Sequence, residues 1–111
     1  MLDTIAAALA ATGIPFKEAA WENRPTGDYG VYTLDGSADS VWADGHMRSM
    51  ALEGTVDLFT RTGGQEKLMT VCTALNGVDG LSWYLSSIQY EQDTRLMHAE
   101  WVISYVVAME A

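Results

Sequence analysis

The chain has 111 residues, the length of one ordinary domain, and 49% of them are hydrophobic. This is enough for a hydrophobic core that needs no disulfide or metal ion to be stable. Its 6 basic and 15 acidic residues give a formal net charge of −9, so binding of nucleic-acid phosphates by a basic face is disfavoured. The single cysteine, Cys72, cannot form an internal disulfide, and the fold therefore does not depend on an oxidising compartment.

The first predicted element is a short amphipathic helix over residues 3–12, which Gly13 can end in a left-handed conformation. Its apolar run, residues 5–11, is too short to span a bilayer, and no Lys or Arg precedes it as in a secretory signal. Pro15 prevents the helix from continuing, so residues 16–21 are expected to be extended. We therefore expect no membrane partner and synthesis in the cytoplasm.

A surface loop and a strand are predicted next. Pro, Gly, Asn and Asp cluster within residues 22–28, and each of them favours turns. Residues 29–34 are rich in aromatic and β-branched side chains and are predicted to form a strand, which Asp35 and Gly36 close.

The segment of residues 36–49 is polar and irregular, yet it carries Trp42 and Met47. Loops longer than about 12 residues are uncommon in compact domains and are usually functional or disordered. We interpret residues 36–49 as a long functional loop whose large apolar side chains contact a partner. That Trp42 folds back on its own domain is an equally open alternative at this point.

Residues 50–61 are predicted to form a long strand in which Leu52, Val56 and Leu58 share one face. Gly54 at its centre indicates a bulge or a close approach of another backbone. This strand is therefore expected to present one apolar face to a core.

A second helix is expected to begin at a capping box formed by Thr62 and Gln65 and to end at Asn76 and Gly77. Four apolar side chains recur along it at the spacing of one helix face: Leu68, Val71, Cys72 and Leu75. On this face Cys72 is expected to be a small, unreactive member of the core.

Two further strands, approximately residues 81–91 and 95–107, are predicted to form an antiparallel hairpin. Alternate residues of the second strand are expected to face the core, namely Met97, Ala99, Trp101, Ile103, Tyr105 and Val107. The order helix, strand, strand, helix, strand, strand predicts an α+β fold with two helices packed on one face of an antiparallel β-sheet. We expect residues 1–111 to form a single domain.

Motifs that announce an enzyme are missing from the sequence, which has no phosphate loop, dinucleotide fingerprint, paired cysteines, HExxH or nucleophile elbow. Asp39, Asp44 and His46 could offer metal ligands, but their spacing does not match a calcium loop and no thiolate or second histidine is nearby. His98 beside Glu100 is expected to be solvated rather than to act as a general base. We therefore expect no catalytic residue, no metal and no cofactor.

Aromatic side chains are abundant in the last two predicted strands, where Trp83, Tyr84, Tyr90 and Trp101 exceed what one small core needs. Aromatic residues are enriched at protein interfaces, but packing inside the helix–sheet core is the favoured interpretation for these four. Exposed strand edges are templates for another chain unless they are blocked. An oligomer would use or cover such an edge.

Three stretches of the sequence share a pattern with a known family. They are residues 29–39 (Tyr-Gly-Val-Tyr-Thr-Leu-Asp-Gly-Ser-Ala-Asp), residues 43–45 (Ala-Asp-Gly) and residues 53–61 (Glu-Gly-Thr-Val-Asp-Leu-Phe-Thr-Arg). With the order of the elements and the terminal Tyr-Val-Val of residues 105–107, the chain resembles small tail-terminator or tail-completion proteins of long-tailed (siphovirus-type) bacteriophages.

The resemblance implies a tail-terminator-like fold and a virion structural protein that works by assembling rather than by catalysis. Such proteins form a ring, usually of six copies, that caps the finished tail tube, stops its polymerisation and joins it to the head. The implied partners are further copies of the chain, the tail-tube protein and the head-completion or connector protein. The implied location is the head-proximal end of the virion tail, after assembly in the host cytoplasm.

The segment of residues 36–49 is the part that the resemblance marks as a contact surface between subunits or with the tube. Its candidate interface residues are Asp39, Trp42, Asp44, His46, Met47 and Arg48. The resemblance also implies that genome DNA passes through the ring without specific binding, and the net charge of −9 suits an acidic lumen that would not hold DNA. A lumen lined by Lys17, Arg24, Arg48 or Arg61 would contradict this hypothesis.

Two alternatives remain open at this point. A head–tail connector, or neck, subunit can share the size, the ring symmetry and the α+β core, and the sequence barely separates the two roles. A small acidic protein-binding module belongs to a different class and would be a stable monomer with one ligand-sized cavity formed by its tryptophans.

Overall fold

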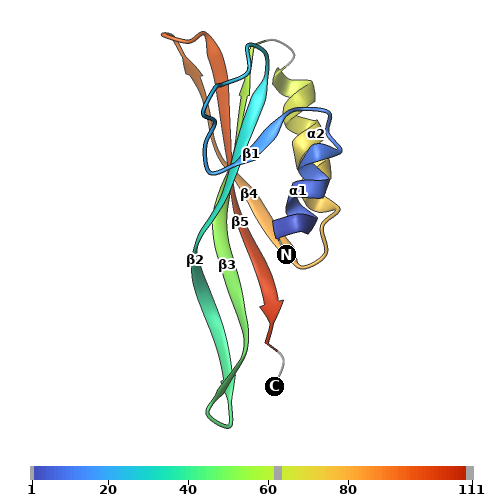
Figure 1. Ribbon diagram of the computed structural model, residues 1–111, viewed down its shortest axis with the longest axis vertical. Helices are drawn as coiled ribbons and strands as arrows, with labels where there is room; N and C mark the ends of the chain where they lie inside the picture. The colour runs from blue at the N-terminus through green and yellow to red at the C-terminus, as the bar shows by residue number, and fades with distance from the viewer. Residues whose placement is uncertain (1, 62–63, 110–111) are drawn as a thin grey trace.

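The computed structural model describes residues 2–61 and 64–109, without the side chains of Leu2, Ala38 and Asp39. The elements of these residues are α1 (Leu2–Ala10), β1 (Phe16–Glu18), β2 (Tyr29–Ala43), β3 (His46–Thr60), α2 (Gly64–Asn76), β4 (Leu81–Glu91) and β5 (Leu96–Ala108). The five strands form one sheet in the order β1-β2-β3-β5-β4, in which only β1 and β2 pair in parallel. Both helices lie on the same face of this sheet (Figure 1), which confirms the predicted α+β fold.

Helix α2 ends where the sequence predicts, whereas α1 ends at Ala10, two residues before the predicted end. After α1 the amide of Ala11 still donates to the carbonyl of Ala7 at 3.1 Å, and Gly13 then adopts a left-handed φ of 80°. Of the segment expected to be extended, residues 16–21, only Phe16–Glu18 form a strand, β1, and Ala19 has a left-handed φ of 69°. Helix α2 ends at Asn76, while Thr62 of its predicted capping box lies outside the described residues. No helix in the described part of the chain is long and apolar enough to cross a membrane.

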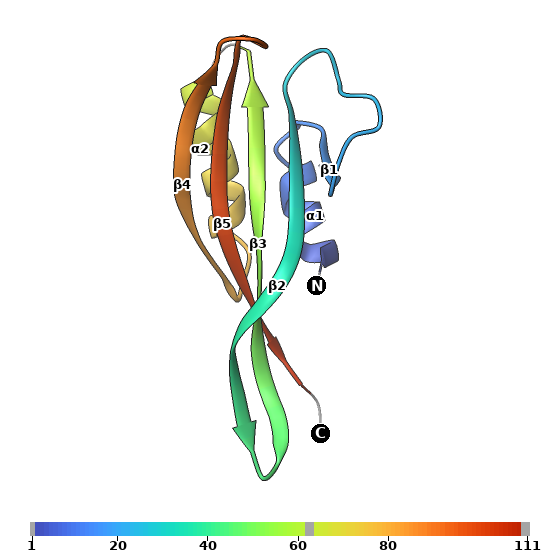
Figure 2. The ribbon, with the colours of Figure 1, turned by 90° about the vertical axis from the view of Figure 1, so that its left-hand side faces the viewer.

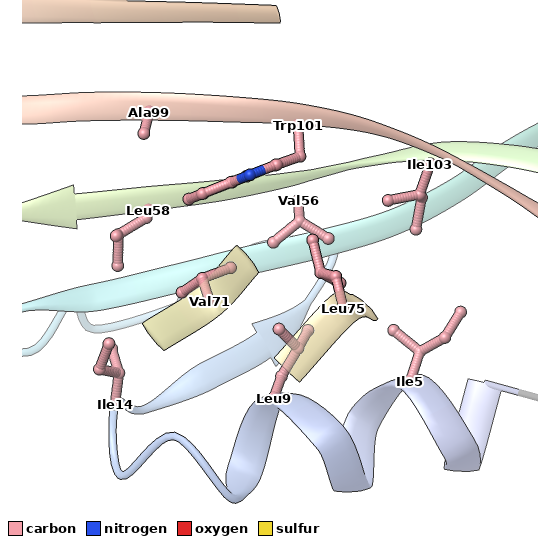
Figure 3. Packing of buried hydrophobic residues seen from close by; sticks show 10 residues of the cluster. All are labelled: Ile5, Leu9, Ile14, Val56, Leu58, Val71, Leu75, Ala99, Trp101 and Ile103. Carbon is pink, nitrogen blue, oxygen red and sulfur yellow. The ribbon is translucent and has the colours of Figure 1, made fainter. Parts of the chain in front are cut away.

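The hydrophobic core lies between the helices and the sheet (Figure 3). Among the described residues, its buried members are Ile5, Leu9, Ile14, Val56, Leu58, Val71, Leu75, Ala99, Trp101 and Ile103. Trp101 is fully buried, and its indole N–H points to Cys72 Sγ at 3.3 Å. The predicted inward face of the last strand and the predicted core position of Cys72 are therefore confirmed.

Gly54 in the middle of β3 marks a close backbone approach, as the sequence predicts. A Cβ atom at this position would lie 1.8 Å from the carbonyl oxygen of Thr33 on β2. The register between β2 and β3 shifts next to this point, between Leu34 and Gly36. Only glycine therefore fits here, because any side chain would push β2 away from β3.

The prediction of a long loop over residues 36–49 is wrong, because the segment is the outer half of a regular β-hairpin. Strands β2 and β3 run to Ala43 and from His46, and they are joined by two residues with positive φ, Asp44 at 52° and Gly45 at 78°. Two left-handed residues in a two-residue loop define the type I′ turn, for which Asp-Gly is a favoured sequence. The alternation that would have indicated a strand is broken by register shifts between residues 34 and 42.

The molecule is elongated, with extents of 53 × 25 × 24 Å. The helices cover one half of its length, and the outer half of the β2–β3 hairpin projects beyond them (Figures 1 and 2). Pairing between β3 and β5 ends at Ser49 and Ala108. Past this point the sheet consists of β2 and β3 alone.

Candidate interaction surfaces

The first candidate surface is the hairpin tip, which we define as residues 41–48. Trp42 and Val41 expose 61% and 55% of their surfaces there. Trp42 is the register partner of Met47 across the hairpin, so the two side chains belong to adjacent strands at the same level. The alternative that Trp42 folds back on its own domain is therefore wrong. Neither helix reaches this end of the molecule (Figure 1).

The predicted interface residues are brought together on this hairpin. Asp44 and His46 are exposed at the turn, whereas Met47 and Arg48 are half-buried. The carbonyl of Arg48 accepts a hydrogen bond of 2.7 Å from the amide of Met109, which ties the tip to the end of β5. The side chain of Asp39, the sixth predicted residue, lies outside the described residues. Contact with a partner at these positions stays a prediction.

The second candidate surface is the face of the sheet that carries no helix. Toward one end of this face three rings stack in a row across the strands: Tyr29 on Phe59 with centroids 4.8 Å apart, and Phe59 on His98 at 4.3 Å. His98 Nε2 lies 2.7 Å from Asp57 Oδ1, and its Nδ1 lies 4.0 Å from Glu91 Oε2. Burial raises the pKa of Asp57, and the hydrogen bond to His98 offsets this rise only in part.

The prediction that His98 is solvated is therefore wrong. Its side chain is 24% exposed and is held by Phe59 and Asp57, both on the neighbouring strand β3. The outward strand position was correctly assigned, but an outward position on a sheet is not a solvated one when the neighbouring strand supplies an aromatic ring. The interaction holds the start of β5 against β3.

A groove of about 630 Å³ opens at the same end of the helix-free face. Tyr29, Val31 and Phe59 form its floor. One wall is the segment of residues 19–24, and the other is the β4–β5 turn of residues 91–94. We call this the end groove. Figures 1 and 2 place the segments that line it at the opposite end of the molecule from the hairpin tip.

Both walls of the end groove are held in place by hydrogen bonds. On one side the indole N–H of Trp21 donates to the carbonyl of Gly30 at 2.8 Å, and the amide of Ala19 donates to the carbonyl of Tyr32 at 2.9 Å. On the other side Glu91 accepts hydrogen bonds from the side chain of Thr94 and, through its carbonyl, from the amide of Arg95. The groove is therefore part of the folded domain and does not depend on a ligand for its shape.

The loop of residues 22–28, which follows this wall, is anchored by Asp28. This carboxylate accepts a hydrogen bond from the backbone amide of Arg61 at 2.8 Å and forms an ion pair with Lys67, while the Arg61 side chain donates to the carbonyl of Thr26. Burial acts to raise the pKa of Asp28, but the hydrogen bonds from Lys67 and Arg61 outweigh it and hold the pKa below its usual value. The sequence predicted the loop but not this anchor.

The edge strand β4 presents a third exposed apolar surface. Tyr84, Ile88 and Tyr90 are 60%, 54% and 64% exposed along it. The four aromatic residues of the last two strands thus divide between two environments, because Trp101 is buried and Trp83 packs against the core cluster. The prediction that all four fill the core holds for the two tryptophans only.

Among the titratable side chains, His98, Asp57 and Glu91 meet on the helix-free face. No group of three His, Cys, Asp or Glu residues in the described part of the chain is arranged to hold a metal ion. Asp44 and His46, considered as ligands, sit on the exposed hairpin turn.

Comparison with known proteins shows a similarity of fold. Neither protein-family models nor curated protein sequences give a match. A chain in the solved structure described as "Virion of native gene transfer agent (GTA) particle" has a similar fold, with a TM-score of 0.54. The similarity covers 95% of this chain and 84% of that chain, at 12% sequence identity. At this identity the similarity concerns the fold.

Proposed function

We propose that the chain is a structural protein of a phage-like virion. The observation that carries this proposal is the fold shared with a chain of a gene transfer agent virion over nearly the full length of both chains. The sequence resemblance to small phage tail proteins was reached independently of that fold and points to the same kind of particle. Two independent lines thus support a role in assembly.

Within the virion, we propose the role of a tail-terminator or tail-completion subunit that forms a ring of about six copies on the tail tube. An elongated domain with a projecting hairpin is suited to contacts with more than one neighbour. The exposed apolar side chains at the hairpin tip and along β4 supply surface that a neighbour would remove from water. The mechanism of such a subunit is surface complementarity with further copies, the tube protein and the head-completion protein.

The part of the helix-free face outside the end groove, and so away from Arg24, is our candidate for the lining of the ring. Register partners place Asp57 next to Glu100, and Glu53 lies on the same face of β3. Carboxylates repel the phosphates of DNA, so a channel lined by this face would let the genome pass without holding it.

A head–tail connector subunit is the alternative role, because the similar chain is named only by its particle. A protein-binding module is the alternative of another class. The end groove favours it, since a groove of about 630 Å³ lies within the usual size range of ligand sites.

The virion proposal is tested in particles. Cells that carry the gene should release particles in which an antibody against the chain labels one position, the head-proximal end of the tail. Deletion of the gene should yield tails of irregular length that lack heads. Heads without tails but with normal free tails would favour the connector, and particles free of the chain would refute both roles.

The ring is tested with the purified chain by light scattering after size exclusion across a wide concentration range, with negative-stain images of any large species. Rings of about six copies would support the terminator role. A monomer that forms rings only when tail tubes are added would support it as well. A monomer that does not bind tail tubes would favour the binding module.

A further inference from the structure

Two apolar features of this molecule have no partner surface within the described residues, and they lie at its opposite ends. At one end the hairpin tip exposes Trp42 and Val41 to water. At the other end the end groove offers an apolar floor of Tyr29, Val31 and Phe59. In a molecule 53 Å long, the two cannot meet within one chain.

The charges around the two features are complementary. The end groove carries Arg24 on one wall and Glu91 and Asp93 on the other. The tip carries the acid Asp44 at its turn and the base Arg48 on the adjacent strand. A tip that enters the groove can therefore place its acid toward the basic wall and its base toward the acidic wall.

Both features are also preorganised. The tip is closed by a two-residue type I′ turn at Asp44 and Gly45, which leaves little freedom at the end of the ribbon. The groove walls are fixed by the hydrogen bonds of Trp21 and of Glu91. Preorganised surfaces lose less conformational entropy on association, so a modest apolar contact suffices.

We propose that the hairpin tip of one copy docks into the end groove of a second copy, with Trp42 against the floor formed by Tyr29 and Phe59. The contact is head-to-tail, since each copy offers one tip and one groove. Repetition of such a contact closes into a ring when its rotation allows and otherwise extends as a filament. The inference rests on the part of the proposed function in which copies of the chain assemble.

Complementation between two variants tests this contact. Trp42→Ala removes the anchor of the tip, and Ala20→Trp fills the groove from its exposed wall. Each variant alone should associate at least tenfold more weakly than the wild type, as expected for an aromatic anchor. An equimolar mixture should form a one-to-one dimer and nothing larger, because only one intact tip and one intact groove can meet.

Met69→Ala is the matched control, since Met69 is 56% exposed but lies on α2, away from both features. It should assemble like the wild type. Circular dichroism and thermal unfolding of each variant confirm that it is folded.

The contact is located by cross-linking. In a Cys72→Ala background, Ala43→Cys places a thiol at the tip and Ala20→Cys places one at the groove. After mixing and mild oxidation, covalent dimers should contain one chain of each kind. A thiol from Asp79→Cys, at an exposed turn away from both features, should give no such dimer with either.

Three results would overturn the inference. Single variants that assemble like the wild type would show that copies meet elsewhere, which leaves the virion proposal intact. A mixture that stays monomeric would show that tip and groove are not partners. A wild-type chain that is monomeric at every concentration, and whose Trp42→Ala variant is still lost from particles, would mean that the tip binds a different virion protein.

Discussion

Trp42 owes its exposure to its place on a two-stranded ribbon. Past Ser49 the sheet has no third strand among the described residues, and both helices end well before this point, so no helix or further strand of that part of the chain covers the indole. Apolar surface in water costs about 25 cal/mol per Å². Trp42 is thus a side chain whose burial depends on another molecule.

Trp42→Ala is therefore expected to lower the thermal unfolding midpoint of the isolated chain by less than about 3 °C. Its self-association should weaken strongly, because the substitution removes apolar area from a contact and not from the core. Differential scanning calorimetry of the monomer and light scattering of the concentrated chain measure the two effects. A drop of several degrees in the monomer would show that Trp42 packs against its own domain.

Asp28 is expected to make stability depend on pH. Its folded pKa lies below the usual value of 3.8, so the carboxylate contributes stability above that pH and loses it as the pH falls through the folded pKa. Asp28→Asn should cost about 1 kcal/mol of unfolding free energy at neutral pH.

The deficit of this variant should shrink as urea titrations are taken below pH 3.8. Asp79→Asn, at an exposed turn, serves as the control and should follow the wild type at every pH. A deficit that is constant from neutral to acid pH would mean that Asp28→Asn loses stability through altered packing or hydrogen-bond geometry, and not through loss of the carboxylate charge.

At the scale of elements, the sequence predicted what has a local cause. Helix ends follow from Gly13 and Pro15, and the inward face of β5 follows from alternation around Trp101. The outer hairpin was missed although Asp44 and Gly45 are a strong hairpin signal. The signal was hidden because the flanking strands bury neither face in the core and therefore carry no apolar alternation.

Gly54→Ala is expected to destabilise the domain by more than about 3 kcal/mol, since the new methyl group would overlap the Thr33 carbonyl and force β2 and β3 apart. Gly27→Ala is the matched control, because nothing lies within 4 Å of its added Cβ atom. Chemical denaturation of both variants gives the comparison. Equal stability of the two would contradict the close approach of the strands.

The candidate surfaces divide in the same way between local and long-range causes. The tip could be predicted because its residues are consecutive. The end groove could not, because residues 19–24, β2, β3 and the turn of residues 91–94 meet there only through the sheet order. The stacking of His98 on Phe59 has the same origin, since these residues are neighbours across β3 and β5 and not along the chain.

At the scale of the whole molecule, the core and the projecting hairpin are separable. The buried cluster extends from α1 and α2 to the inner parts of β3 and β5, and it includes no residue of the tip. The molecule thus consists of a domain with a hydrophobic core and an arm, which is the outer half of the β2–β3 hairpin. The arm adds contact surface at little cost to the fold.

Replacing residues 42–48 with Asn-Gly is expected to leave a folded domain. Val41 and Ser49 are register partners, so a two-residue turn can join them and preserve the pairing of Ser49 with Ala108. The shortened chain should unfold cooperatively near the wild-type midpoint but should no longer assemble. Loss of the cooperative transition would mean that the arm is part of the folding unit.

The sheet order also has a consequence for synthesis. Strand β5 lies between β3 and β4, yet it leaves the ribosome after both of them, and it brings Trp101 to the centre of the core. A nascent chain that lacks β5 has no strand that pairs with both β3 and β4. We therefore expect the sheet to be completed only after β5 has emerged, so that the proposed pairing of copies would wait until β5 is in place.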